Sequence, residues 1–172
     1  TDAHILEGPI GQVRDSQSYR LRGTVTEPAR PIAGGHLFLP LEKSSERINC
    51  AAFEPTKNFR STIRELAPGD ELEVFGSVRD VTLNLEKINI LHLSERKSLA
   101  APPCPLCGKR MESAGRGQGY RCRRCKTRAT GPVSQSTPCR LEPGYYEVPP
   151  CARRHLSKPL VRMDGERVHP SR

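Results

Sequence analysis

Two pairs of cysteines are the residues of this 172-residue chain whose spacing most clearly indicates chemistry. Cys104 and Cys107 form one C-x-x-C pair, and Cys122 and Cys125 form the second after an interval of fourteen residues. Four thiolates at this kind of spacing can hold one zinc ion and complete its tetrahedral shell. A closed shell leaves no position for water or substrate, so the pattern predicts one structural Zn²⁺ in a zinc ribbon.

Basic and aromatic side chains gather around the second cysteine pair. Arg123 and Arg124 lie between its two cysteines, Arg121 comes before them, and Arg116 and Tyr120 lie in the preceding glycine-rich stretch. Because arginine makes bidentate contacts with phosphate, we predict that these five residues contact RNA. The alternative is structural, since four thiolates and one Zn²⁺ carry a formal charge of about −2, which neighbouring arginines would balance.

The net charge of +9 belongs to one end of the chain. Residues 1–99 hold 13 Lys and Arg against 14 Asp and Glu, whereas residues 100–172 hold 15 against 5, and 12 of those 15 are Arg. This local excess favours a nucleic-acid partner. A membrane is not indicated, because no apolar run approaches the roughly 20 residues of a membrane span and no signal peptide opens the chain.

The last segment, residues 131–172, is rich in Pro and Arg and shows little periodicity. Basic and His side chains are interleaved there, and we predict RNA contacts from Arg153, Arg154, His155 and Lys158. A solvated basic tail is the alternative. We expect this segment to become ordered only by packing on the ribbon or on RNA.

Three cysteines lie outside the two pairs. Cys50 is in a strand-like run and is expected to be a small core residue. Cys139 and Cys151 could bind a second metal or pair with each other, although no further ligands at suitable spacing accompany them. Metal-binding thiolates without a secretory signal indicate a reducing compartment, so we expect a cytoplasmic protein.

Upstream of the ribbon, five runs alternate between apolar and polar residues with the period of a β-strand. These runs are residues 17–27, 36–41, 47–53, 71–79 and 82–93. Between the third and fourth runs, Phe59, Ile63 and Leu66 form the single apolar stripe of a short helix. The alternation slips in phase between Leu85 and Ile88, which predicts a β-bulge.

Three strands, a helix and two strands form the element order of an OB-fold barrel, and Gly23 and Gly76 fall in mid-strand where a small barrel bends. Another five-stranded barrel or a meander is the alternative. We therefore predict a mainly β chain: a five-stranded OB-fold barrel with one short helix, then a four-cysteine zinc ribbon and an irregular basic tail. The expected segments are a connector (1–15), the barrel (16–95), a linker (96–103), the ribbon (104–130) and the tail (131–172).

The barrel offers an outer face to single-stranded or distorted nucleic acid. The alternation turns Phe38 and Phe53 outward, where they could stack on bases, and Arg20 and Arg22 of the first run could contact phosphates. The alternative is that each Phe covers a hydrophobic patch. The sequence has no P-loop, G-x-S-x-G motif or dinucleotide fingerprint, so its residues predict binding and not catalysis.

Several strings resemble the C-terminal half of the archaeal isoleucine-tRNA 2-agmatinylcytidine synthetase family. They are T-D-A-H at residues 1–4, G-G-H at 34–36, A-A-F-E-P-T-K-N-F-R at 51–60, L-N-L-E-K at 83–87, the two C-x-x-C pairs, and A-R-R-H-L-S-K-P-L at 152–160. The resemblance covers nearly the whole chain and is specific as a combination. The additional Cys139 and Cys151 depart from it.

The resemblance implies an enzyme that uses ATP and Mg²⁺ to attach agmatine to the wobble cytidine of an isoleucine tRNA. It also implies that a kinase-like domain and a ferredoxin-like domain, both N-terminal to the barrel, carry out catalysis, and neither is recognisable in this chain. The chain would then be the tRNA-binding portion, joined in cis to the catalytic domain, and whether it has ligase activity of its own stays open. The first residue is Thr1 and not Met, as expected for a chain cut from a longer protein.

Two other functions stay open on the residues alone. A stand-alone OB-fold protein would prefer single-stranded nucleic acid to folded tRNA. A zinc ribbon can also bind a protein partner, in which case the tail arginines would not be needed for RNA. The sequence does not indicate an oligomeric state.

Overall fold

The computed structural model describes residues 4–153, 159–162 and 168–169. The chain folds into two compact units: the first combines Thr1–Ser94 with Cys139–Arg172, and the second is Glu95–Pro138. The second unit is therefore an insertion, after which the chain returns to the first. Among the described residues, no helix has both the length and the hydrophobicity needed to cross a membrane.

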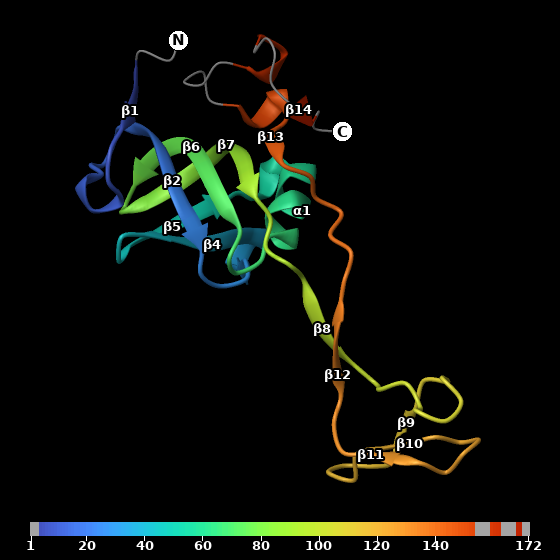
Figure 1. Ribbon diagram of the computed structural model, residues 1–172. Coiled ribbons are helices and arrows are strands. Elements are labelled where there is room, and N and C mark those ends of the chain that lie inside the picture. The colour runs from blue at the N-terminus through green and yellow to red at the C-terminus, as the bar shows by residue number, and fades with distance from the viewer. Residues whose placement is uncertain (1–3, 154–158, 163–167, 170–172) are drawn as a thin grey trace. The chain divides into compact units, whose positions relative to one another are not determined.

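Five strands of the first unit close into a barrel (Figure 1). They are β2 (Ser18–Val25), β4 (His36–Lys43), β5 (Glu46–Ala52), β6 (Glu71–Arg79) and β7 (Thr82–His92). β2 pairs antiparallel with β4 and β6, β4 pairs with β5, β6 pairs with β7, and a parallel pairing of β5 with β7 closes the ring. A closed five-stranded barrel of this kind, with one helix between β5 and β6, confirms the predicted OB-fold.

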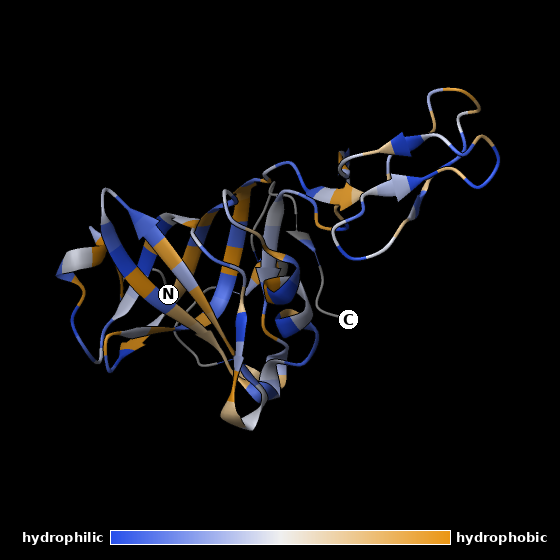
Figure 2. Cartoon of the chain, turned by 90° about the horizontal axis from the view of Figure 1, so that it is seen from below, coloured by the Kyte–Doolittle hydropathy of each residue, from blue (hydrophilic) through white to orange (hydrophobic). Residues whose placement is uncertain are grey.

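The barrel closes because each strand presents one apolar face. On β4, Leu37, Leu39 and Leu41 are at most 1% exposed, whereas the alternate residues His36 and Phe38 are half-buried. Figure 2 shows the same alternation of hydrophobic and hydrophilic positions along the barrel strands. The period of two along these strands is therefore the pattern of a sheet with one buried face, as predicted.

Helix α1 spans Asn58–Glu65 and follows a 3-10 turn at Glu54–Thr56. Phe59 and Ile63 lie one turn apart on the same face of the helix, and both pack into the barrel core together with Leu66. This stripe is the one that the sequence predicted.

Strands β6 and β7 approach each other closely at a bulge. Phe75 pairs with Lys87, but the next residue, Gly76, pairs with Leu85, so β7 contains one extra residue at this point. A Cβ atom on Gly76 would lie 1.9 Å from the backbone oxygen of Asn84, which leaves room only for glycine. The bulge accounts for the phase slip that the sequence shows after Leu85.

The N-terminal residues are more ordered than a connector. β1 (Ile5–Glu7) pairs in parallel with β2, and a 3-10 turn at Ile10–Gln12 places the side chain of Ile10 in the barrel core. A strand of three residues is too short to show periodicity, which is why a segment rich in Gly and Pro looked like a connector.

The C-terminal segment packs on the barrel, which corrects the expectation that it becomes ordered only on the ribbon or on RNA. β13 (Gly144–Glu147) pairs with the stretch of β7 beyond its pairing with β5, and β14 (Val168–His169) pairs in parallel with β13. Tyr145 and Val148 are buried there. The short strand β13 covers an edge of β7 that would otherwise stay unpaired.

Short elements complete the first unit. They are β3 (Arg30–Ile32) and 3-10 turns at Ala33–Gly35, Pro150–Ala152 and Leu160–Arg162. β3 extends the sheet by pairing antiparallel with β4.

The second unit consists of two small sheets. Three strands of two residues each pair antiparallel in the order β11 (Arg128–Ala129), β10 (Tyr120–Arg121), β9 (Glu112–Ser113). β8 (Lys97–Ala100) pairs antiparallel with β12 (Val133–Ser136), so residues that were expected to form a linker include a strand.

Candidate zinc site and nucleic-acid interface

Four cysteine sulfurs of the second unit converge on one point. The Sγ atoms of Cys104, Cys107, Cys122 and Cys125 all lie within 4.8 Å of one another, and those of Cys107 and Cys122 are 3.6 Å apart. A tetrahedral zinc ion with Zn–S bonds of about 2.3 Å places its sulfurs about 3.8 Å apart. The sulfur geometry therefore fits one Zn²⁺ in a closed four-thiolate shell.

Each cysteine pair lies on a knuckle with the same backbone hydrogen bonds. The N–H of Gly108 donates to the carbonyl of Cys104 at 2.8 Å, and the N–H of Lys126 donates to the carbonyl of Cys122 at 2.9 Å. Gly108 and Lys126 both have left-handed backbones, with φ of +69° and +62°. The two knuckles are structural repeats, and each directs its pair of sulfurs to the shared site.

Cys104 and Cys125 differ in how readily their thiols ionise in the cluster. Although burial opposes ionisation, backbone N–H groups of Leu106 and Cys107 lower the pKa of Cys104 to about 6. The hydrogen bond with Cys107 raises the pKa of Cys125 to about 12. Four thiolates together therefore require a cation among them, which Zn²⁺ supplies.

The zinc site takes the place of a hydrophobic core in this unit. Its buried cluster consists of Cys104, Met111 and Cys122, with Tyr120 and Ala129 packed against them. So few apolar side chains cannot stabilise a separate unit of this size, so folding depends on the metal. The zinc is structural, as the sequence predicted.

The ribbon presents exposed guanidinium groups. Arg116, Arg121, Arg123 and Arg124, all predicted as RNA contacts, are exposed. Arg123 pairs with Glu112 at 2.6 Å. Within the described residues, no carboxylate pairs with the other three arginines, so their charges are available to an anionic ligand.

Arg121 stands directly opposite Arg128 across the β10–β11 pair. Like charges at directly opposed positions destabilise an antiparallel sheet. On its other side Arg121 faces Glu112, whose carboxylate already pairs with Arg123. Sequence reasoning missed Arg128, because the register of two-residue strands cannot be read from periodicity.

The side chain of Tyr120 contributes to the packing of the second unit. Its ring packs against the cysteine cluster, opposite Ala129 in the β10–β11 pair and Ser113 in the β10–β9 pair. The side chain is half-buried, so only part of its ring could meet a base.

Arg20 and Arg22 are held by carboxylates of the barrel. The guanidinium of Arg20 lies 2.8 Å from Glu73 and 3.0 Å from Glu7, and that of Arg22 lies 3.3 Å from Glu71. A phosphate at either side chain would compete with these ion pairs. The pairing of β2 with β6 creates them, and the sequence alone does not show that register.

Phe38 and Phe53 are both half-buried on the outside of the barrel, in different surroundings. Phe38 lies opposite Ala51 and Arg30 in the strand pairing. The ring centroid of Phe53 lies 5.0 Å from that of His36, edge to face, beside a pocket.

The predicted RNA contacts of the tail fall into two groups. The guanidinium of Arg153 pairs with Glu147 at 2.5 Å and is largely buried, so it anchors the C-terminal segment. Arg154, His155 and Lys158 lie outside the described residues.

The remaining cysteines take no part in the zinc cluster. Cys50 is fully buried in the barrel core, and burial raises its pKa, as expected of a small core residue. Cys139 and Cys151 are free thiols in the first unit.

Known proteins match both units of this chain. A family model described as the TiaS C-terminal zinc ribbon domain matches residues 101–141. A relative from Archaeoglobus fulgidus, the isoleucine-tRNA 2-agmatinylcytidine synthetase TiaS, is 51% identical over 98% of this chain and 40% of its own length. The chain belongs to the TiaS family, whose C-terminal portion it matches.

Solved TiaS structures agree with this assignment. A crystal structure of apo TiaS is 50% identical, with a TM-score of 0.82 over 100% of this chain and 42% of that chain. A crystal structure of TiaS in complex with its isoleucine tRNA and ATP is 49% identical, with a TM-score of 0.80 over 98% of this chain and 40% of that chain. The chain therefore spans about two fifths of the length of the TiaS proteins that it matches.

Proposed function

We propose that this chain is the tRNA-binding portion of an ATP-dependent enzyme that attaches agmatine to the wobble cytidine of an isoleucine tRNA. The TiaS relatives carry that activity in their name, and one similar structure is a complex with an isoleucine tRNA and ATP. Catalysis, with ATP and Mg²⁺, is assigned to a kinase-like domain outside these residues. The zinc ion of this chain has a structural role.

The opposed arginines on β10 and β11 carry the proposal. Arg121 and Arg128 face each other without a carboxylate to separate them in the described residues. This arrangement is unfavourable for the ribbon alone and becomes favourable when a phosphate lies between the two guanidinium groups. A pair of opposed cations that an anion stabilises is expected of a surface that holds RNA.

The charge of the whole second unit supports the same conclusion. Residues 95–138 hold ten Lys and Arg against two Glu. The zinc and its four thiolates remove about two of those positive charges, and a clear excess is left. Arg116 and Arg124 extend this positive surface beyond the arginine pair.

The barrel and tail are assigned weaker roles in the same function. Phe38 and Phe53 offer aromatic surface to unpaired bases, whereas Arg20 and Arg22 would have to exchange their carboxylates for phosphates. Tyr120 and Arg153 support the fold as well as any RNA contact, and Arg154, His155 and Lys158 are kept as proposed contacts. A reduced zinc site is suited to the cytoplasm, where we place the protein.

A competition experiment tests the proposal. Labelled isoleucine tRNA bound to the chain is displaced with unlabelled tRNA or with single-stranded DNA of equal length. We expect tRNA to displace the label at the lower concentration, because the ribbon and barrel together would match a folded RNA. Stronger displacement by single-stranded DNA would favour a stand-alone OB-fold protein.

A second assay addresses catalysis. The chain alone is incubated with ATP, agmatine and tRNA, and transfer of labelled agmatine to tRNA is measured. We expect no transfer, since the proposal places the reacting groups elsewhere. Transfer by the chain alone would contradict that division of roles.

A further inference from the structure

The two-stranded sheet of β8 and β12 is exposed to solvent along its length (Figure 1). Within the described residues no third strand pairs with either of its edges. Seven of its eight residues are exposed, and Ala100 is half-buried. A sheet of two strands that buries neither face gains little stability of its own in water, so its side chains are available to a ligand.

The two faces of this sheet differ in how far the chain uses their side chains. Directly opposed residues share a face, and successive residues alternate between faces. The closed face consists of Ser98, Ala100, Val133 and Gln135, and the open face consists of Lys97, Leu99, Ser134 and Ser136. On the closed face the Thr137 hydroxyl donates to the Ser98 hydroxyl at 2.9 Å, and Arg110 donates to the carboxamide oxygen of Gln135 at 2.9 Å. The polar groups of the closed face are therefore used within the chain.

The open face combines hydroxyl groups with an aliphatic side chain and a cation. Leu99 is 76% exposed and lies directly opposite Ser134. The hydroxyls of Ser134 and Ser136 have no hydrogen-bond partner among the described residues. Lys97 pairs with Glu95 at 3.0 Å, but both side chains are exposed, and a phosphate can compete with such a pair.

This combination of side chains fits the sugar of a nucleotide. A serine hydroxyl both donates and accepts hydrogen bonds, as the 2′-hydroxyl of ribose does, and an aliphatic side chain can pack on the carbon atoms of the sugar. Double-stranded RNA displays its 2′-hydroxyls in a minor groove that is wide and shallow. Two strands about 4.8 Å apart form a surface flat enough to lie on that groove.

The surroundings of the open face favour RNA over a protein partner. Residues 95–138 hold ten Lys and Arg against two Glu, and the bond from Arg110 to Gln135 joins this sheet to the body of the zinc ribbon. Arg128 of the opposed arginine pair precedes the first residue of β12 by five positions. Leu99 is the one large apolar side chain of the open face, which is little for a protein interface, because such interfaces have apolar centres.

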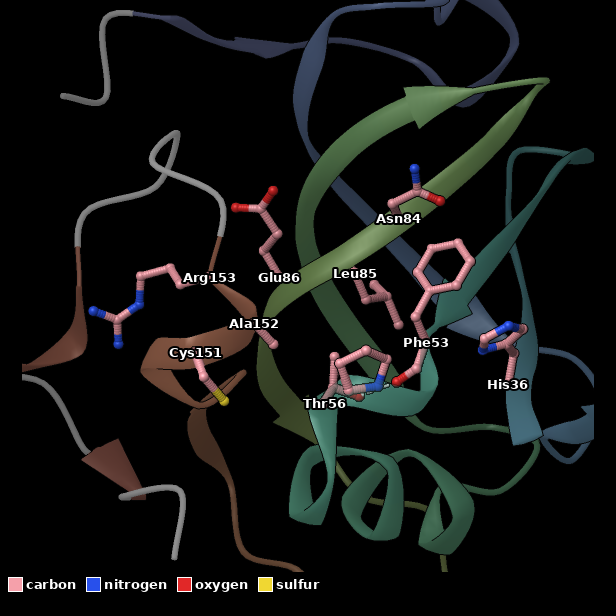
Figure 3. Close-up of a pocket in the computed structure, with 10 residues that line it drawn as sticks. His36, Phe53, Thr56, Asn84, Leu85, Glu86, Cys151, Ala152 and Arg153 are labelled. Atoms are coloured by element: carbon pink, nitrogen blue, oxygen red, sulfur yellow. Dashed lines mark hydrogen bonds between the residues drawn. The ribbon is translucent and has the colours of Figure 1, made fainter. Parts of the chain in front are cut away.

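The pocket of the first unit does not offer such unused groups (Figure 3). It has a volume of about 490 Å³, and His36 and Arg153 are among its lining residues. Nδ1 of His36 accepts the N–H of Glu54 at 2.9 Å. The guanidinium of Arg153 points away from the other labelled side chains and pairs with Glu147. Both groups are used within the first unit, whereas the two serine hydroxyls of the open face are not used by the chain.

We propose that the open face of β8 and β12 lies in the minor groove of a double-stranded stem of the bound tRNA. Ser134 and Ser136 hydrogen-bond there to ribose 2′-hydroxyls, and Leu99 packs against a ribose. The inference rests on the proposed function, because the stem belongs to the bound tRNA. Since these contacts reach sugars and not base edges, they distinguish RNA from DNA and do not depend on base sequence.

Duplexes of one sequence and three sugar chemistries test the proposal. The zinc-loaded chain is titrated into fluorescently labelled duplexes of RNA, of 2′-O-methyl RNA and of DNA. The 2′-O-methyl duplex keeps the A-form shape and lacks the hydroxyl donor. We expect the RNA duplex to bind about tenfold more tightly than either of the others, as the loss of two hydrogen bonds implies. Equal affinity for RNA and 2′-O-methyl RNA would overturn the proposal.

Variants locate the discrimination on the open face. Ser134→Ala with Ser136→Ala should lower the affinity for the RNA duplex about tenfold and leave the affinity for DNA unchanged. Ser134→Thr with Ser136→Thr keeps both hydroxyls and should retain the preference for RNA. Ser98→Ala, which removes a hydroxyl from the closed face, is the matched control and should also retain it. Since all three serines are exposed, each variant should keep its zinc content. An undiminished preference for RNA in the double alanine variant would contradict the proposal.

Two further outcomes separate this inference from its rivals. Dimers of the RNA-free chain in analytical ultracentrifugation, abolished by Leu99→Glu, would make the open face an interface between copies and overturn the proposal. If the chain binds tRNA but does not prefer the RNA duplex, this inference fails and the proposed function stands. If it prefers the RNA duplex but does not bind tRNA, the open face is a surface for RNA and the proposed function fails.

Discussion

The Sγ atoms of Cys107 and Cys122 lie 3.6 Å apart, although fourteen residues lie between them in the chain. Two knuckles with the same hydrogen bonds bring them together, and the segment between the knuckles includes the exposed Arg116 and Arg121. One metal ion therefore fixes both the fold of the second unit and the spacing of its positive charges.

Replacing one zinc ligand should remove the metal and leave the barrel folded. Cys122→Ser takes a thiolate from a shell that needs four, so we expect loss of the bound zinc and of ordered ribbon signals. The five-stranded barrel has its own core and should keep its amide protection. Cys139→Ser is the control and should retain one zinc per chain, measured with a chromogenic chelator. Full zinc content in Cys122→Ser would refute the four-cysteine site.

The two knuckles carry different residues, Gly108 and Lys126, at the position with the left-handed backbone, so substitutions there should have opposite effects. Lys126 has a left-handed φ of +62°, which costs a residue with a Cβ about 1 kcal/mol. Lys126→Gly should therefore tighten zinc binding about fivefold, and Gly108→Ala should weaken it by a similar factor. Competition with a chelator of known affinity measures both. Lys109→Gly removes the same charge as Lys126→Gly and should bring no gain, so equal effects of the two would contradict the argument.

Removing the opposed arginines should lower the affinity for RNA without lowering the stability of the ribbon. In Arg121→Gln with Arg128→Gln, each lost phosphate contact should reduce the log–log salt slope by about 0.7–0.9. The ribbon itself should be as stable as before, or more stable by a few tenths of a kcal/mol, since a like-charge pair is gone. Arg79→Gln on the barrel is the control, because that side chain is exposed and has only a 4.0 Å contact with Asp80. Unchanged tRNA affinity in the double variant would remove the main support for the proposed function.

The bulge predicts a strong effect of a single methyl group. Gly76→Ala places a Cβ atom 1.9 Å from the backbone oxygen of Asn84, so β6 and β7 must separate. We expect a loss of about 1–3 kcal/mol or more in the free energy of unfolding, measured by urea denaturation. Gly8→Ala, where nothing lies within 4 Å of the added atom, should change stability little.

The barrel could be predicted from the sequence because its signals are local. Leu37, Leu39 and Leu41 alternate within one strand, and Phe59 and Ile63 lie one helical turn apart, so each pattern is complete within a few residues. β1 and β13 could not be predicted in this way. They are three and four residues long and are held by pairing with β2 and β7, and such tertiary pairing leaves no period in the sequence.

The site was predictable to a similar degree. The spacing of the cysteines follows directly from the geometry of a zinc knuckle, so the four metal ligands could be identified from the sequence. The opposition of Arg121 to Arg128, the ion pairs of Arg20 and the burial of Asn84 depend on register between strands, which the sequence does not state. Charge and spacing therefore indicated the kind of surface, and only the structure indicated which arginines are available.

The central claim is that this chain holds tRNA through phosphate contacts of its zinc ribbon. The most direct test is the affinity of the zinc-loaded chain for isoleucine tRNA, measured across a range of salt concentrations. The account predicts a linear fall of log affinity with log salt, with a slope of about −0.7 to −0.9 for each phosphate contacted. An affinity that does not change between low and moderate ionic strength would contradict it.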